Sequence, residues 1–134
     1  MTRFESDIKT VNQPSSEIYA VLSDFDNFDV LLPADKIKNW KSSGDSCRFE
    51  VIGIGQVGLK IVDKEQYKTI KYTADGSVPF HFFLWIQLKQ IDTSTTKIKV
   101  TLDAELNPML KMVASGPLKK FVGLLADSVS SHSY

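Results

Sequence analysis

The chain has 134 residues, of which 43% are hydrophobic and 24% are charged, a composition that excludes a disordered segment and is typical of a globular domain. Lys and Arg together number 16, as do Asp and Glu, so the formal net charge is zero and no overall field attracts nucleic acid or anionic lipid. The single cysteine, Cys47, excludes an internal disulfide. No apolar run approaches the ~18 residues of a membrane span. We therefore expect one domain over residues 1–134, located in the cytoplasm, with no nucleic-acid partner, no cofactor and no bound metal.

The first quarter of the chain predicts a strand, a short helix and a turn. Polar and apolar residues alternate from Phe4 to Val11, which indicates a strand. Ser15 is then expected to be the N-cap of a short helix, because apolar residues follow it at helical spacing. The segment DFDNFDVLLP, residues 24–33, mixes turn formers with apolar residues. We expect it to turn the chain and place its apolar side chains under the sheet.

Six further strands are expected at residues 37–42, 46–52, 56–63, 66–74, 80–91 and 96–106. The short turns between them predict an antiparallel meander with one apolar and one wet face. In the strand at 80–91 one row holds Phe82, Leu84, Ile86 and Leu88, while His81, Phe83 and Trp85 form the opposite row. Exposed apolar area of this kind usually marks an interface, so a homodimer is predicted. One sequence does not settle the register of this strand.

The last long stretch, Pro108 to Ser131, predicts an amphipathic helix. Its apolar stripe comprises Leu110, Val113, Ala114, Leu118, Phe121, Leu124 and Leu125. Such a stripe must lie on something apolar, and the simplest partner is one face of the antiparallel sheet. Pro117 lacks an N–H group and crowds the carbonyl of Val113, so the first third of the helix is expected to bend or separate from the rest. The fold class is therefore α+β.

The order of strand, short helix, six strands and long C-terminal helix resembles the START-like, or helix-grip, superfamily, which includes polyketide cyclase-like and Bet v 1-like proteins. Two stretches carry the resemblance: IKTVNQPSSEIYAVLSDFDNF, residues 8–28, and the passage from Glu105 through Pro108 into LKMVASGPLKKFVGLLAD. The resemblance implies a curved antiparallel sheet of about seven strands wrapped around the long helix. It also implies a cavity, which in relatives holds lipids, sterols, quinones, hormones or polyketides and in a minority supports catalysis.

The glycines of GIGQVG, at positions 53, 55 and 58, match the GxGxxG pattern of dinucleotide-binding proteins. That pattern needs a helix to begin there, so that its N-terminus holds the pyrophosphate. The following residues, LKIVDKE, alternate as a strand instead. We therefore interpret the glycines as a hairpin turn or bulge.

Metal ligands are not evident in the sequence. Asp24, Asp26 and Asp29 lie close together, but they lack the glycine and the terminal glutamate of a calcium loop. Cys47, His81 and His132 are isolated and have no ligand spacing. The aspartates are interpreted as helix-end and turn residues.

Whether the protein is an enzyme stays open at this point. His81 is the histidine candidate for a general acid or base, and Asp103 and Glu105 are two carboxylates on one strand face that could divide those roles. The charged neighbours of the two carboxylates favour a solvated face. Cys47 lies on an apolar row, which is typical of a small buried residue. No catalytic residue is assigned.

A ligand cavity is expected at the N-terminal third of the long helix. The apolar side chains of the stripe are small or sparse there, and the bend at Pro117 should move them away from the sheet. Its occupant should be a small apolar or aromatic molecule, anchored by the Tyr72 hydroxyl or the Trp40 indole N–H. The predicted ligand-binding residues are Trp40, Phe49, Leu59, Tyr72, Leu84, Val100, Met109, Met112, Val113 and Pro117.

Three function classes follow. The first is a binding or carrier domain for a lipid-, quinone- or polyketide-like molecule. The second is a cyclase or dehydratase acting on such a molecule, and the third is a co-chaperone-like interaction module. A carrier should show an apolar cavity, an enzyme should place titratable side chains in that cavity, and an interaction module should show a filled core with a large exposed patch.

Overall fold

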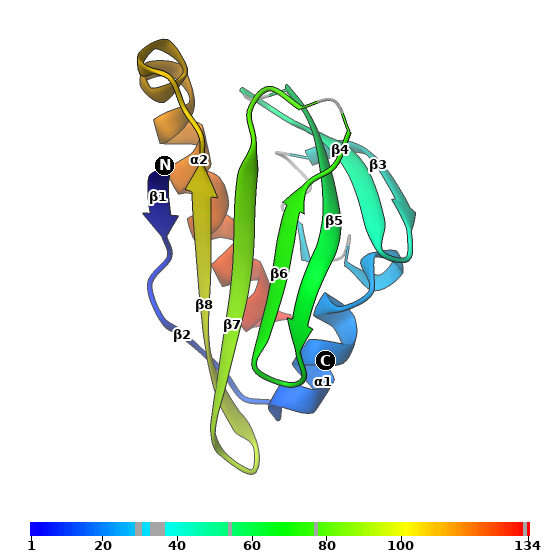
Figure 1. Ribbon diagram of the computed structural model, residues 1–134. Coiled ribbons are helices and arrows are strands. Elements are labelled where there is room, and N and C mark those ends of the chain that lie inside the picture. The colour runs from blue at the N-terminus through cyan, green and yellow to red at the C-terminus, as the bar shows by residue number, and fades with distance from the viewer. Residues whose placement is uncertain (29–30, 33–36, 54, 77, 133) are drawn as a thin grey trace.

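A curved antiparallel sheet with a long helix across one face dominates the computed structural model (Figure 1). The structure describes residues 1–28, 31–32, 37–53, 55–76, 78–132 and 134. The strands are β1 (Thr2–Glu5), β2 (Lys9–Val11), β3 (Ile37–Ser43), β4 (Ser46–Val51), β5 (Gly55–Glu65), β6 (Thr69–Ala74), β7 (Phe82–Asp92) and β8 (Thr95–Ala104). The helices are α1 (Ser15–Leu22), the short 3-10 helix η1 (Phe25–Asn27) and α2 (Pro108–Ser131).

The strands lie in the order β1-β8-β7-β6-β5-β4-β3, and β2 also pairs with β8. Every pairing is antiparallel, and strands that follow one another from β3 to β8 are neighbours. Because β1 and β2 both pair with β8, the sheet has seven strand positions, as the sequence predicts. The α+β helix-grip architecture is confirmed.

The predicted first strand is divided in two by Ser6. The Ser6 amide donates to the Val100 carbonyl at 2.9 Å, and the Ser6 hydroxyl accepts from the Val100 amide at 2.9 Å. The hydroxyl thus takes the place that a backbone carbonyl holds in a regular ladder. The strand expected at 66–74 is also shorter than predicted, because β5 continues to Glu65 and the turn follows it.

The register of β7 agrees with the predicted rows. Phe82, Leu84, Ile86 and Leu88 are buried on the inner face. On the outer face Phe83 and Trp85 are half-buried, and their ring centroids are 6.0 Å apart. The Lys71 ammonium lies 4.5 Å from the centroid of Phe83 and 5.3 Å from that of Trp85. The outer aromatic pair is therefore partly covered by a cation.

The start of α1 differs from the prediction. Pro14 occupies the N-cap position without a side-chain cap, and Ser15 is the first helical residue. The Ser15 amide and hydroxyl both donate to Oε1 of Gln90, at 2.9 and 2.8 Å. Ser15 therefore ties α1 to β7 instead of capping its own helix, a long-range contact that local sequence does not reveal.

In the segment after α1, the apolar side chains that the structure describes are buried, as predicted. Asp24 caps η1 by accepting from the Asp26 amide at 2.9 Å. Phe25, Phe28 and Leu31 are fully buried. Asp29, Val30 and Pro33, which belong to the same predicted segment, lie outside the described residues.

Helix α2 continues through Pro117 and packs against β1, β2 and β8. Its predicted stripe is partly wrong. Ala114, Leu118 and Leu125 are buried, but Val113 is 64% exposed. The buried row continues instead through Val122, Ala126 and Val129. The buried row is therefore rotated around the helix relative to the predicted stripe. The sheet covers the side of the helix that carries Ala114, and Val113 lies ~100° away from Ala114 around the helix axis.

The glycines of GIGQVG serve the hairpin between β4 and β5, so the hairpin interpretation is confirmed. Gly53 and Gly55 have φ angles of 88° and 112°, which L-residues rarely adopt. Gly58 has a different role within β5. Its carbonyl accepts from the Asp75 amide at 2.8 Å, and a Cβ at this position would overlap the Asp75 carbonyl oxygen.

We expect Gly58→Ala to lower the free energy of unfolding by on the order of 2–4 kcal/mol, because the backbone of residue 75 must move away. The matched control is Gly123→Ala in α2, where a Cβ would meet nothing within 4 Å. That change should raise stability by about 0.5–1 kcal/mol through helix propensity. Urea unfolding of both variants measures the difference. Equal effects would contradict the steric role of Gly58.

Candidate ligand-binding site

An apolar cavity lies between α2 and the inner face of the sheet. It is lined by Phe49, Val51, Val57, Leu59, Phe80, Phe82, Leu84, Leu102, Leu118 and Phe121. Among the described residues, no polar or titratable side chain contributes to this lining. The cavity volume is about 30 Å³, which is room for roughly one water molecule. The surrounding side chains therefore nearly fill the site in this structure.

A larger groove adjoins the cavity between α2 and the end of β4. Its volume is about 220 Å³, and it is lined by Val51, Ile52, Gly116, Pro117, Lys120, Phe121 and Leu124. Val51 and Phe121 line both spaces, so these two side chains stand between them. Gly53, which follows β4, packs close to α2 here. A Cβ atom built on Gly53 would lie 3.6 Å from Cγ of Pro117.

Four of the ten predicted ligand-binding residues lie at these two spaces. Phe49, Leu59 and Leu84 line the cavity. Pro117 lines the groove. Strand alternation was the signal for the first three, since it assigned them to the inner face.

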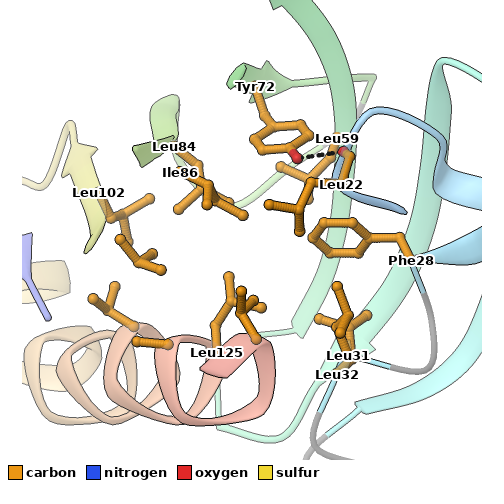
Figure 2. Close-up of a cluster of buried hydrophobic side chains, with 14 of the residues drawn as sticks. Leu22, Phe28, Leu31, Leu32, Leu59, Tyr72, Leu84, Ile86, Leu102 and Leu125 are labelled. Carbon is orange, nitrogen blue, oxygen red and sulfur yellow. Dashed lines mark hydrogen bonds between the residues drawn. The ribbon is translucent and has the colours of Figure 1, made fainter. Parts of the chain in front are cut away.

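Three other predicted residues do not line the cavity: Tyr72 and Val100 belong to the buried core, and Trp40 is partly buried and packs against it. Val100 and Tyr72 are fully buried. The Tyr72 hydroxyl donates to the Leu22 carbonyl at 2.6 Å, as Figure 2 shows. Complete burial raises the pKa of Tyr72 well above its ordinary value. Trp40 stacks on Phe49 with a centroid distance of 5.5 Å. In this structure the Tyr72 hydroxyl therefore bonds to the protein backbone, whereas the sequence analysis expects it to anchor a ligand.

The remaining three predicted residues, Met109, Met112 and Val113, are 75%, 87% and 64% exposed. They belong to the first turns of α2, which extend beyond the end of β8 (Figure 1). The cavity lies further along the helix, beside Leu118 and Phe121. The expected position at the N-terminal third of the helix therefore differs from the observed one, because the sheet ends before it reaches those turns.

Sequence reasoning missed seven lining residues: Val51, Val57, Phe80, Phe82, Leu102, Leu118 and Phe121. Val51, Phe82 and Leu102 lie on predicted inward rows and could have been found by alternation. The sequence places Leu118 and Phe121 on the apolar stripe of the long helix, and their large side chains by themselves favour a filled core. Whether a space remains beside them depends on the curvature of the sheet.

The titratable candidates for catalysis lie away from the cavity lining. His81 is exposed. Arg3 donates to both carboxylate oxygens of Asp103, at 2.7 and 2.9 Å, and this bonding lowers the pKa of Asp103. Burial raises the pKa of the Cys47 thiol to about 12, so the thiol is a weak nucleophile at neutral pH. Within the described residues no three His, Cys, Asp or Glu side chains gather into a metal site.

Solved structures of known proteins share this architecture. A START superfamily protein from Mycobacterium smegmatis is 17% identical, with 96% of this chain and 94% of that chain covered and a TM-score of 0.69. A protein from Thermus thermophilus is 13% identical, with 96% and 94% covered and a TM-score of 0.72. A point mutant of norcoclaurine synthase from Thalictrum, in complex with a transition-state analogue, is 15% identical, with 96% and 91% covered and a TM-score of 0.71.

These likenesses show that the chain has the START-like, Bet v 1-like fold that its sequence resembles. No family model matches the chain, and no curated protein sequence does. None of the helices that the structure describes has the length and apolar character needed to cross a membrane.

We expect Tyr72→Phe to lower the free energy of unfolding by about 1–2 kcal/mol, because the Leu22 carbonyl loses its partner in a dry environment. Tyr67→Phe is the matched control, since Tyr67 is 44% exposed and its change should fall within about 0.5 kcal/mol. Urea unfolding compares the two. Unchanged stability together with weaker binding of an apolar probe would instead assign the Tyr72 hydroxyl to a ligand.

Proposed function

We propose that this protein binds or carries a small apolar molecule of lipid-, quinone- or polyketide-like character in the cavity between the sheet and α2. The observation that carries the proposal is the lining, which consists entirely of aliphatic and aromatic side chains. The side chains around such a void lack van der Waals contacts on the side that faces it. They offer no hydrogen bond to a polar ligand. The START-like fold supports the same class of function.

Because the cavity is small, ligand binding requires a conformational step. Pockets for small molecules usually enclose ~300–1,000 Å³, far more than the cavity offers. The groove beside it, with a volume of about 220 Å³, would supply most of the missing space once Phe121 and Val51 move apart. Phe121 is half-buried, and we propose that the opening step rotates its ring toward solvent. Phe49, Leu59, Leu84 and Leu118 are then the proposed ligand contacts.

A cyclase or dehydratase activity is the alternative, and one fold neighbour, norcoclaurine synthase, is named as an enzyme. Such chemistry needs a proton donor or acceptor within reach of the bound molecule. His81, Asp103 and Cys47 do not line the cavity, so the carrier function has the better support. A co-chaperone-like interaction module is the third alternative.

The cytoplasmic location and the homodimer stay predictions. The motive for the homodimer was the outer row of β7. There Lys71 partly covers Phe83 and Trp85, which leaves less free apolar area than the sequence indicates. A sedimentation experiment at micromolar concentration that detects a dimer, and its loss in Trp85→Ser, would support the homodimer.

Two substitutions should change probe binding in opposite directions. Phe121→Ala removes the ring between cavity and groove and should tighten the binding of 1-aminoanthracene about tenfold, since the joined space needs no opening step. Val57→Phe fills the cavity and should abolish binding, at a cost of about 1–3 kcal/mol in stability. Fluorescence titration measures the affinity, and urea unfolding measures the stability.

Val62→Phe is the control for these variants, because Val62 lies on the same strand as Val57 but is 46% exposed. It should leave probe binding unchanged. If the wild type and Phe121→Ala both fail to bind the probe while remaining folded, the carrier proposal is wrong.

Protein purified gently from its own host should carry an apolar molecule. Native mass spectrometry should then show a species heavier than the polypeptide, and organic extraction should release the added mass. The Val57→Phe variant from the same host should show the polypeptide mass alone. An identical bound mass in both proteins would place the molecule outside this cavity.

A further inference from the structure

The first turns of α2 carry an exposed apolar cluster that the ligand site does not use. Met109, Met112 and Val113 are 75%, 87% and 64% exposed. With ~100° between residues, the three lie within about 100° of one another around the helix and point away from the buried Ala114 and Leu118, with Val113 at the edge of this group. They form a single patch, which we call the α2 patch. Contiguous exposed apolar area of this kind marks an interaction surface.

The charges next to the α2 patch are positive. Lys111, Lys119 and Lys120 are all exposed, and no carboxylate occurs between Pro108 and Ala126. The nearest acidic residues along the chain are Glu105, which is exposed just before the helix, and Asp127, which pairs with Lys9 at 3.0 Å. By the same helical spacing, Lys119 and Lys120 lie on the side of the helix that carries the α2 patch, about two turns further along, whereas Lys111 lies on the other side. Although the whole chain is neutral, this face of α2 therefore presents two cations next to three apolar side chains.

We propose that the α2 patch docks on the surface of an anionic lipid bilayer. Methionine and valine side chains would enter the boundary between head groups and acyl chains, while the lysines approach the lipid phosphates, as in interfacial amphipathic helices. A bilayer fits these flexible, unbranched methionine side chains because it demands no shape complementarity.

A second copy of the chain is a poorer partner for the same surface. A two-fold interface brings each patch against its own equivalent. Such an interface would gather Lys119 and Lys120 of both copies into one contact area, and an excess of like charge within an interface opposes association. The bilayer offers the opposite sign of charge.

The α2 patch also borders the groove described above, since Gly116 and Lys120 line the groove and follow Val113 by one or two turns. Docking would turn the mouth of this groove toward the lipid. The inference does not depend on the proposed carrier function, because vesicle binding is measured without any ligand in the cavity.

The test is co-sedimentation with vesicles of phosphatidylcholine containing about 30% phosphatidylserine, against pure phosphatidylcholine. The wild type should partition onto the anionic vesicles, and less so as salt rises. Lys119→Gln combined with Lys120→Gln should weaken partition by on the order of tenfold. Met112→Gln combined with Val113→Gln should weaken it on both vesicle types. Circular dichroism checks that each variant is folded.

The matched control is Lys64→Gln combined with Lys89→Gln, which removes the same charge from exposed positions on β5 and β7. It should leave partition nearly unchanged. Equal loss in both lysine pairs, or no partition of the wild type, would overturn the proposal. Detection of a dimer in the absence of vesicles that Met112→Gln abolishes would also overturn it and assign the patch to self-association.

Discussion

The apolar inner face of the sheet is too wide for one helix to cover, and much of the structure follows from this constraint. Seven strand positions spaced ~4.8 Å apart span roughly 30 Å, whereas a helix with its side chains is ~10 Å wide. Helix α2 packs against β1, β2 and β8. The other half of the sheet is covered by the segment around η1. There Phe25 and Phe28 pack on Tyr72 with centroid distances of 5.4 and 5.8 Å, as the close-up in Figure 2 shows for Phe28.

The cavity is a by-product of the way α2 meets the sheet. Leu118 and Phe121 face side chains from β4, β5, β7 and β8 across a space that these side chains do not fill. Figure 2 shows Leu84 and Leu102 from the strands on one side and Leu125 from α2 on the other. Because every lining group is apolar, the site can select a guest by size and shape but cannot orient it by hydrogen bonds. Binding suits this site better than proton-transfer chemistry does.

Helix α2 has two faces that serve different purposes. Its buried row, from Ala114 to Val129, holds the fold together, while Met109, Met112 and Val113 contribute little to the core because they extend past the sheet. The zero net charge of the whole chain gives no sign of the exposed lysines on α2. Net charge describes the far field, whereas a docking surface depends on charges within about one Debye length, ~8–10 Å.

The sequence by itself determined the order of elements, the antiparallel sheet, the rows of β7 and the hairpin at Gly53 and Gly55, because alternation, turn residues and helical spacing are local properties. It also assigned Phe49, Leu59 and Leu84 to the inner face. Tertiary structure alone decided the position of the cavity and the exposure of Met109, Met112 and Val113. These depend on where the sheet ends relative to α2 and on how far it curves, which no local pattern encodes. For the same reason Ser15, a plausible cap, instead binds the distant Gln90.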